Sequence, residues 1–423
     1  MILSKLILLS ILPVLLFAQS TIDNNLKELM RYAIANSPEI KMSESMKEST
    51  KKRAIYRSSI SDPELMFGIM NLPLWNFSFT EEMMTMKTIQ LTQMLPFPGY
   101  NDAKKNFVLT DTLLIDADFR IDANKLISEI YTTVIDAKFS LEQYKLSLKS
   151  IELMEQLLPV VRVMYEVNEE SIENSIKLEI EIEMMRENSK MYSGMYNESI
   201  SMLKNLTNND NVEPFISGMI FDETNFDVEN FEATNIANPL LLKPEASKLS
   251  AIKMREMNEF EKYPMFSFSV QYGFRNKMQP SGMEQKDMLS LMAGLTLPLN
   301  YGGKTTAMLE ESEFMIKYSE AQSEMLLREL STMTASSIEK IKSLRERVKI
   351  TGVTLKSKSK LAFELALTAY QNGKTSYMSL IEALNKMIEV DKMLLSLKKE
   401  LNQQVAVIGY LTGATLTEVL NEK

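Results

Sequence analysis

The sequence predicts an α+β membrane protein whose four β-strands contribute to a barrel shared between copies, with long helical hairpins attached. Three observations carry this prediction. Residues 62–100 and 263–303 each have the pattern of a β-hairpin. Unbroken helical periodicity follows each hairpin, over 101–206 and 304–412. The whole unit, including its prolines, recurs after about 201 residues, which indicates a tandem duplication.

The composition excludes several classes of function. The chain has 423 residues and a net charge of −9, and its lysines and arginines form no single patch, which argues against nucleic acid as a partner. It contains no cysteine and no histidine, so disulfides, thiol nucleophiles and Cys/His zinc sites are impossible. We therefore expect neither a cofactor nor enzymatic activity.

Residues 1–18 are typical of a secretory signal peptide. Lys5 precedes an apolar segment, 6–17, that is too short to span a bilayer, and Ala18 is a plausible last residue before cleavage. A membrane anchor is the alternative. No other segment has 18 consecutive apolar residues, so we expect any membrane crossing to be made by β-strands.

The remaining segments connect these parts. Residues 19–61 are expected to form two helices, the second rich in lysine and arginine, and its equivalent in the second half is 239–262. Residues 207–238 hold seven acidic residues and no lysine or arginine, which predicts a solvated connector. Residues 413–423 are expected to be a C-terminal tail.

The four strands alternate between two kinds of side chain. One face carries Leu, Ile, Phe, Val and Tyr, and the other carries Met, Thr, Ser, Gln and Gly. This alternation favours a lipid face opposite a lumen face, although a half-buried strand of a soluble core is the alternative. Seven methionines fall on the predicted lumen face: Met66, Met70, Met86, Met94, Met265, Met288 and Met292.

The methionines have two possible roles. Thioethers are soft ligands that suit Cu(I) or Ag(I), so these side chains could line the path of a soft ion. Alternatively, methionine simply fills irregular apolar gaps. Trp75, Phe77 and Phe79, in the loop between the first two strands, could form an interfacial aromatic belt or pack within the loop.

Each hairpin ends in a segment rich in proline and glycine, which we expect to join a strand to a helix. These joint residues are Pro96, Pro98, Gly99, Pro298, Gly302 and Gly303. Four strands cannot close a barrel, and an open edge in lipid leaves backbone groups unpaired, so the chain is expected to oligomerise. Three copies would supply twelve strands.

The sequence resembles the TolC-like outer-membrane efflux proteins over nearly the whole mature chain. The repeated unit, the proline-rich joints and the segment AYQNGKTSYMSLIEA at 369–383 carry the resemblance, the last being similar to the family's Tyr-x-x-Gly signature. The stretches MNLP at 70–73, MTMK at 84–87 and QMLPFPG at 93–99 are similar to the heavy-metal, CusC-like branch.

The resemblance implies a homotrimer with a twelve-stranded outer-membrane barrel in lipid and an α-helical periplasmic tunnel. It also implies docking to a periplasmic adaptor and to an inner-membrane pump of the resistance-nodulation-division type. By resemblance, the adaptor contacts lie at two helical tips and the pore gate on the last long helix. The tip residues are Asn168, Glu169, Asn372, Gly373 and Lys374, and the gate candidates are Glu382 and Ser379.

These observations predict an exit duct that passively conducts cargo to the exterior, with heavy-metal ions such as copper or silver as the expected cargo. A duct for drugs or for type I protein secretion is the alternative, because a fold does not choose cargo. A purely structural coiled-coil protein is a further alternative, which the strand pattern disfavours. Glu382 could equally lie on an ordinary solvated helix face.

Overall fold

The computed structural model describes residues 24–166, 171–218 and 237–421, which fall into two compact units. One unit comprises residues 42–118 and 242–324, and the other comprises 24–41, 119–241 and 325–421 within the described ranges. The expected signal peptide and most of the acidic connector lie outside these ranges. Among the described residues, no helix combines the length and the apolar character needed to cross a membrane.

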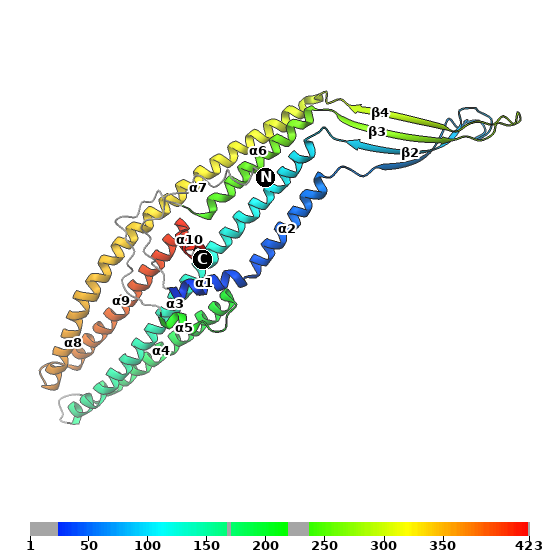
Figure 1. Cartoon of the computed structure of the whole chain (residues 1–423). Helices are drawn as coiled ribbons and strands as arrows, with labels where there is room; N and C mark the ends of the chain where they lie inside the picture. The colour runs from blue at the N-terminus through cyan, green and yellow to red at the C-terminus, as the bar shows by residue number, and fades with distance from the viewer. Residues whose placement is uncertain (1–23, 167–170, 219–236, 422–423) are drawn as a thin grey trace. The chain divides into compact units, whose positions relative to one another are not determined.

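The first unit contains the four predicted strands in one antiparallel sheet, which confirms the predicted fold class (Figure 1). The strands are β1 (Glu64–Met70), β2 (Met86–Leu95), β3 (Met265–Phe274) and β4 (Met288–Thr296), in the order β1-β2-β3-β4. The two hairpins are joined through β2 and β3, where the hydroxyls of Thr92 and Ser269 are hydrogen-bonded at 2.9 Å. β1 and β4 are the two edges.

Each strand continues from, or into, a helix of the same unit. α2 (Pro38–Ser58) precedes β1, and α3 (Tyr100–Glu166) follows β2. α6 (Leu242–Glu259) and the 3-10 turn η2 (Phe260–Lys262) precede β3, and the turn η3 (Tyr301–Gly303) with α7 (Lys304–Lys349) follows β4. The helices lie side by side in the order of their strands (Figure 1).

The predicted joint residues all lie between a strand and a helix. Gly99 has φ +93°, and Gly302 and Gly303 have φ +67° and +74°, so the chain turns there through left-handed conformations that favour glycine. A Cβ on Gly99 would lie 3.1 Å from the Phe260 ring. The rings of Phe97 and Tyr263 stack at 4.4 Å beside it and connect this joint to the segment that leads into β3.

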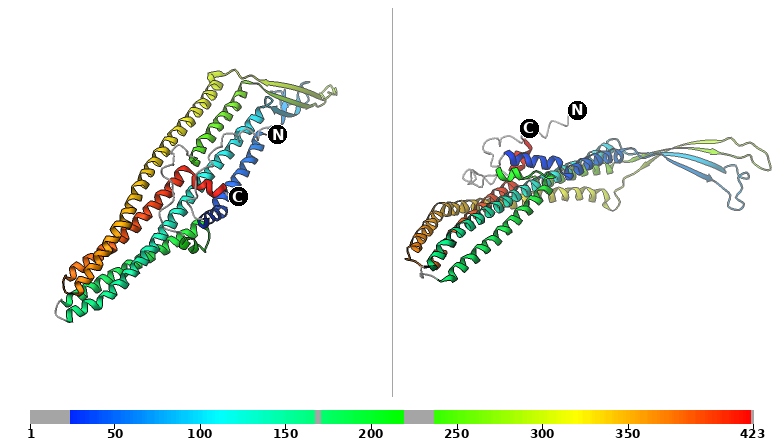
Figure 2. Two further views of the ribbon diagram at one scale, coloured as in Figure 1. Left: turned by 60° about the vertical axis from the view of Figure 1, so that its left-hand side comes forward. Right: turned by 90° about the horizontal axis from the view of Figure 1, so that it is seen from below.

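The second unit is built from two helical hairpins (Figure 2). α3 pairs with α4 (Ile172–Thr207) through ion pairs such as Arg186–Glu155 at 2.6 Å. The other hairpin runs through α7, the π-helical turn η4 (Ile350–Leu355) and α8 (Lys356–Gln371), and returns along α9 (Tyr377–Thr412). The chain turns at 372–374 between α8 and α9. η4 is an irregularity that the periodicity did not indicate.

Buried apolar side chains of the second unit form three clusters. One joins α3 and α4 to the short helices α1 (Asn24–Asn36) and α5 (Glu213–Gly218), one fills the tips of both hairpins, and one lies between α7 and α9. The turn η1 (Pro239–Leu241) leads into α6. The hairpins are thus held by packing that spans elements far apart in the sequence.

Residues 414–421 of the expected C-terminal tail form a helix, α10 (Ala414–Asn421). Leu416 and Val419 are buried in the cluster that contains α1. Lys27 on α1 is 1% exposed, and its ammonium contacts the Glu418 carboxylate at 3.1 Å. A segment of only eight residues gives little periodicity, so the sequence did not reveal this packing.

Glu418→Ala should destabilise the chain by about 3 kcal/mol, because it removes the Glu418 carboxylate from its contact with the buried Lys27 ammonium. The measurement is the thermal unfolding midpoint of the purified protein. Glu389→Ala is the matched control, since it breaks an exposed ion pair with Lys386 whose loss should cost less than about 1 kcal/mol. Equal shifts for both variants would contradict a structural role for the buried pair.

Candidate conduction surface and helical tips

The strand register assigns every strand residue to one of two faces. Residues directly opposite each other in an antiparallel pair lie on the same face. Met66 is opposite Gln90, Gln90 is opposite Gln271, and Gln271 is opposite Ser290. The face that contains this row, here called the methionine face, carries Met66, Met70, Met86, Met94, Met265, Met288 and Met292.

The opposite face is apolar and exposed in the single chain. It carries the row Phe67, Ile89, Tyr272 and Leu289, in which Phe67 is 72% exposed. In the next row Leu291 is 73% exposed. Its polar exceptions are Lys87 and Gln93. Large contiguous apolar surfaces mark contact with a membrane or with another protein.

All seven methionines of the four strands lie on the methionine face, although its other residues are mostly Thr, Ser, Gln and Gly. Methionine used as a general apolar filler should also occur on the apolar face, where Leu, Phe, Ile, Val and Tyr are used instead. The separation therefore favours a role for thioethers on the polar side of the sheet.

Three of these methionines lie at the loop end of the sheet. Met70 ends β1 and is directly opposite Met86, which begins β2. Met288 begins β4 and is opposite Gly273. A Cβ on Gly273 would lie 2.4 Å from the Met86 Sδ, so the glycine leaves room for this side chain.

The loop between β1 and β2 gives its aromatic residues different environments. Trp75 and Phe77 are exposed, whereas the Lys87 ammonium lies 5.0 Å from the centre of the Phe79 ring. Phe79 therefore packs within the hairpin, whereas the aromatic side chains of Trp75 and Phe77 are exposed to contact with lipid or another protein.

The helical tip between α8 and α9 is well defined. Asn372, Gly373 and Lys374 are exposed in its turn, where Gly373 has φ +65°. The Ser376 Oγ accepts a hydrogen bond from the backbone N–H of Ser379 and caps α9. Asn168 and Glu169, expected at the other tip, lie outside the described residues.

Two buried tyrosines hold this tip. Tyr370 and Tyr377 are 1% and 2% exposed, in the cluster that joins both hairpins. Burial, with smaller effects from Glu181 and Tyr370, raises the pKa of Tyr377 to about 12, so this phenol is neutral at pH 7. Ser379 and Glu382 are exposed and one helical turn apart on α9, and both can face a pore or bulk water.

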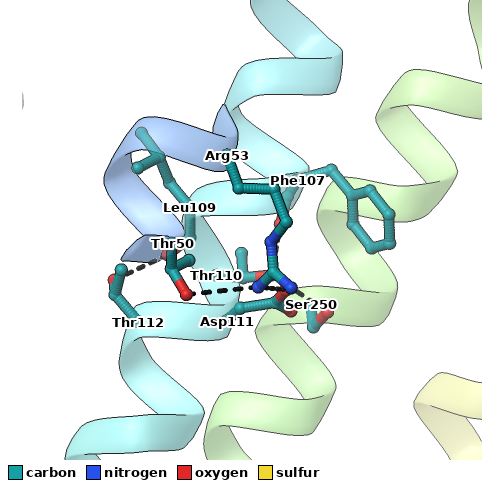
Figure 3. A network of polar contacts seen from close by, with 8 residues as sticks. All are labelled: Thr50, Arg53, Phe107, Leu109, Thr110, Asp111, Thr112 and Ser250. Carbon is teal, nitrogen blue, oxygen red and sulfur yellow. Dashed lines mark hydrogen bonds and ion pairs between the residues drawn. The ribbon is translucent and has the colours of Figure 1, made fainter. Parts of the chain in front are cut away.

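A ladder of polar contacts along α2, α3, α6 and α7 was not anticipated from the sequence. Arg53 Nη2 donates to Asp111 Oδ2 at 2.7 Å and also bonds Thr50, while Thr110 Oγ1 bonds Ser250 Oγ at 3.0 Å (Figure 3). Lys243 contacts Asp118 at 2.7 Å. These contacts join α2 to α3 and α3 to α6.

The ladder repeats with the duplication, which is the signal that could have revealed it. Lys47–Asp116 and Arg53–Asp111 join α2 to α3, and Lys248–Glu320 and Arg255–Glu313 join α6 to α7. Both partners of Arg53–Asp111 and Arg255–Glu313 are 202 positions apart, whereas Lys47 and Lys248 are 201 positions apart and their acidic partners are not at equivalent positions. Two basic residues of the second predicted helix, Lys47 and Arg53, thus have acidic partners on the next helix.

Comparison with known proteins supports the fold. Residues 237–414 match the model of the family described as outer membrane efflux protein. No curated protein sequence matches the chain.

Solved structures match over almost the whole chain at low identity. The outer-membrane channel OprN has a TM-score of 0.74 and 12% identity, covering 92% of this chain and 90% of its own. CusC, described in connection with transmembrane channel formation, has a TM-score of 0.71 and 15% identity, covering 92% of each chain. The CmeC outer membrane channel of Campylobacter jejuni has a TM-score of 0.71 and 14% identity, covering 93% of this chain and 86% of its own.

The second half of the chain thus carries the sequence pattern of the outer membrane efflux protein family, and the described chain as a whole has the fold of solved outer-membrane channels.

Proposed function

We propose that three copies of this chain form the outer-membrane exit duct of a tripartite efflux system, which conducts cargo passively and performs no catalysis. One observation carries the proposal: the four-stranded sheet has an exposed apolar face and two unpaired edges, β1 and β4. A sheet in lipid must have every backbone group paired, and natural membrane barrels have at least eight strands. Pairing β4 of one copy with β1 of the next satisfies both requirements.

The edge helices favour the same arrangement. α2 contains six Lys or Arg residues against three Glu, whereas residues 304–324 of α7 contain five Glu against two Lys. The edges also expose apolar side chains, Met42 and Tyr56 on α2 and Phe314 and Tyr318 on α7. Opposite charge around apolar contacts suits α7 of one copy packing on α2 of the next.

The duplication supplies a template for that contact between copies. Inside one chain, α3 meets α6 through Asp118 and Lys243 at 2.7 Å. The equivalent positions in the other repeat are Glu320 on α7 and Met42 on α2. We therefore expect Glu320 of one copy to lie close to Met42 of the next.

Cysteine cross-linking tests this assembly, because the natural chain contains no cysteine. The double variant Met42→Cys, Glu320→Cys should form disulfides on oxidation and give a ladder of bands that ends at three chains. Met42→Cys with Glu311→Cys is the control, since nine residues along α7 are about 13 Å and exceed the reach of a disulfide. Cross-linking of the control pair alone, or of neither pair, would refute the proposed contact between α7 of one copy and α2 of the next.

The adaptor and the pump are proposed as partners in accordance with the sequence resemblance, with the exposed turn residues Asn372, Gly373 and Lys374 as the contact. Copper and silver ions are the proposed cargo, supported by the methionine face. Expression with the cognate adaptor and pump should restore silver tolerance to cells that lack their own exit duct. Restored tolerance to drugs alone would favour the drug duct instead.

Glu382→Gln should reduce the cation selectivity of the channel if Glu382 faces the constriction, since three copies would lose three carboxylates from one ring. The measurement is the reversal potential in a planar bilayer under a salt gradient. Glu198→Gln, a change of the same charge at an exposed position of α4, is the control and should leave the potential unchanged. An unchanged record for Glu382→Gln would place this carboxylate on a solvated face.

A further inference from the structure

We propose that Met70, Met86 and Met288 form a discrete, weak binding site for a soft monovalent cation, Cu(I) or Ag(I), at the loop end of the methionine face. The site adds a binding step to the proposed duct. It rests on the proposed function only because that function places the methionine face in the lumen. Its chemistry depends on the sheet of one chain alone.

The register brings the three thioethers to one place. Met70 and Met86 are directly opposite each other, and opposite residues have Cβ atoms about 5 Å apart. The Met86 side chain lies over Gly273, whose absent Cβ would be 2.4 Å from the sulfur. Gly273 is itself opposite Met288. The glycine therefore lets Met86 extend across β3 towards the side chain of Met288.

Two of the three sulfur atoms already act as acceptors. Gln271 Nε2 donates to Met70 Sδ at 2.7 Å, and Arg275 Nη1 donates to Met288 Sδ at 3.5 Å. These thioethers thus present lone pairs to polar donors rather than packing only among hydrocarbon. Rotation of the Gln271 amide would replace its N–H with a carbonyl oxygen as a further ligand.

The local charge makes such a site weak, which suits a duct that must release its cargo. The Arg275 guanidinium repels a cation at Met288. Asp287 partly offsets this charge, because its carboxylate accepts from the Arg275 backbone N–H at 2.9 Å and from the Tyr272 hydroxyl at 2.8 Å. Soft thioethers still discriminate against Na⁺ and K⁺, which prefer oxygen ligands.

A chain without cysteine and histidine gives an unusually direct test, because thioethers are then its principal soft ligands. The full-length protein in detergent would be titrated with silver nitrate in a chloride-free buffer, followed by calorimetry. The site variant is Met70→Leu, Met86→Leu, Met288→Leu. The matched control is Met184→Leu, Met195→Leu, Met202→Leu, three exposed methionines of α4.

The natural protein and the control variant should each bind one silver ion per chain more tightly than any further silver ions. The site variant should lose this tightly bound ion. X-ray absorption of the silver-loaded protein should show sulfur ligands that are absent from the site variant. Leucine matches methionine in volume, so the variant is expected to fold, and single-channel conductance verifies this. Identical isotherms for a conducting site variant and the natural protein would overturn the site while leaving the duct intact. Absence of conductance in the natural protein would count against the duct instead.

Discussion

Leu291→Arg should prevent assembly of the chain in the outer membrane, whereas Ser290→Arg, at the adjacent position, should be tolerated. Leu291 lies in the middle of β4 on the apolar face and is 73% exposed in the single chain. Ser290 lies on the methionine face, opposite Gln271. If the apolar face meets lipid, as proposed, an arginine at its centre costs about 2–4 kcal/mol, so three copies bring about 6–12 kcal/mol.

Membrane fractionation and heat-modifiable migration measure this effect. Leu291→Arg should be absent from the folded, membrane-inserted fraction, and Ser290→Arg should insert like the natural protein. The pair differs by one position in the strand, so propensity and edge exposure are matched. Exclusion of Ser290→Arg with tolerance of Leu291→Arg would reverse the two faces, and tolerance of both would argue against a lipid-facing sheet.

Gly413→Ala should destabilise the fold by about 2–5 kcal/mol. Gly413 ends α9 with φ +71°, a left-handed conformation that costs other residues about 1–2 kcal/mol. A Cβ there would lie 2.6 Å from the carbonyl oxygen of Ala237, and overpacking costs about 1–3 kcal/mol more. Hydrogen bonds hold this segment against the end of α9, because Asn238 Nδ2 donates to the carbonyls of Tyr410 and Leu411 at 2.9 Å.

Thermal unfolding followed by circular dichroism measures this change, with Gly194→Ala as a control of opposite sign. Gly194 lies inside α4, and a Cβ there meets no atom within 4 Å. Alanine should therefore raise helix stability by about 0.5–1 kcal/mol. A lowered thermal unfolding midpoint in both variants, or in neither, would contradict the claim that the close contact between Gly413 and Ala237 requires glycine.

The sequence by itself determined the four strands with their faces and the long helices. Strict two-residue alternation in the strands, prolines at the helix ends and a duplicated pattern each depend on neighbours along the chain. Met265 and Met288 could therefore be placed on one face before any partner strand was known, and the register confirms that placement. The turn at Gly373 was also predictable from neighbours along the chain, because a glycine between two long segments of helical apolar periodicity indicates a turn.

Only the tertiary structure decided which distant residues meet. The packing of α10 on α1 through Glu418 and Lys27, the closeness of Gly413 to Ala237, and the space that Gly273 leaves for Met86 all join positions far apart in the chain. No periodicity in a single sequence encodes such partners, since each depends on how whole elements pack. The sequence thus determined a duplicated chain of strands and long helices, and the fold decided where its thioethers, buried charges and close backbone contacts come together.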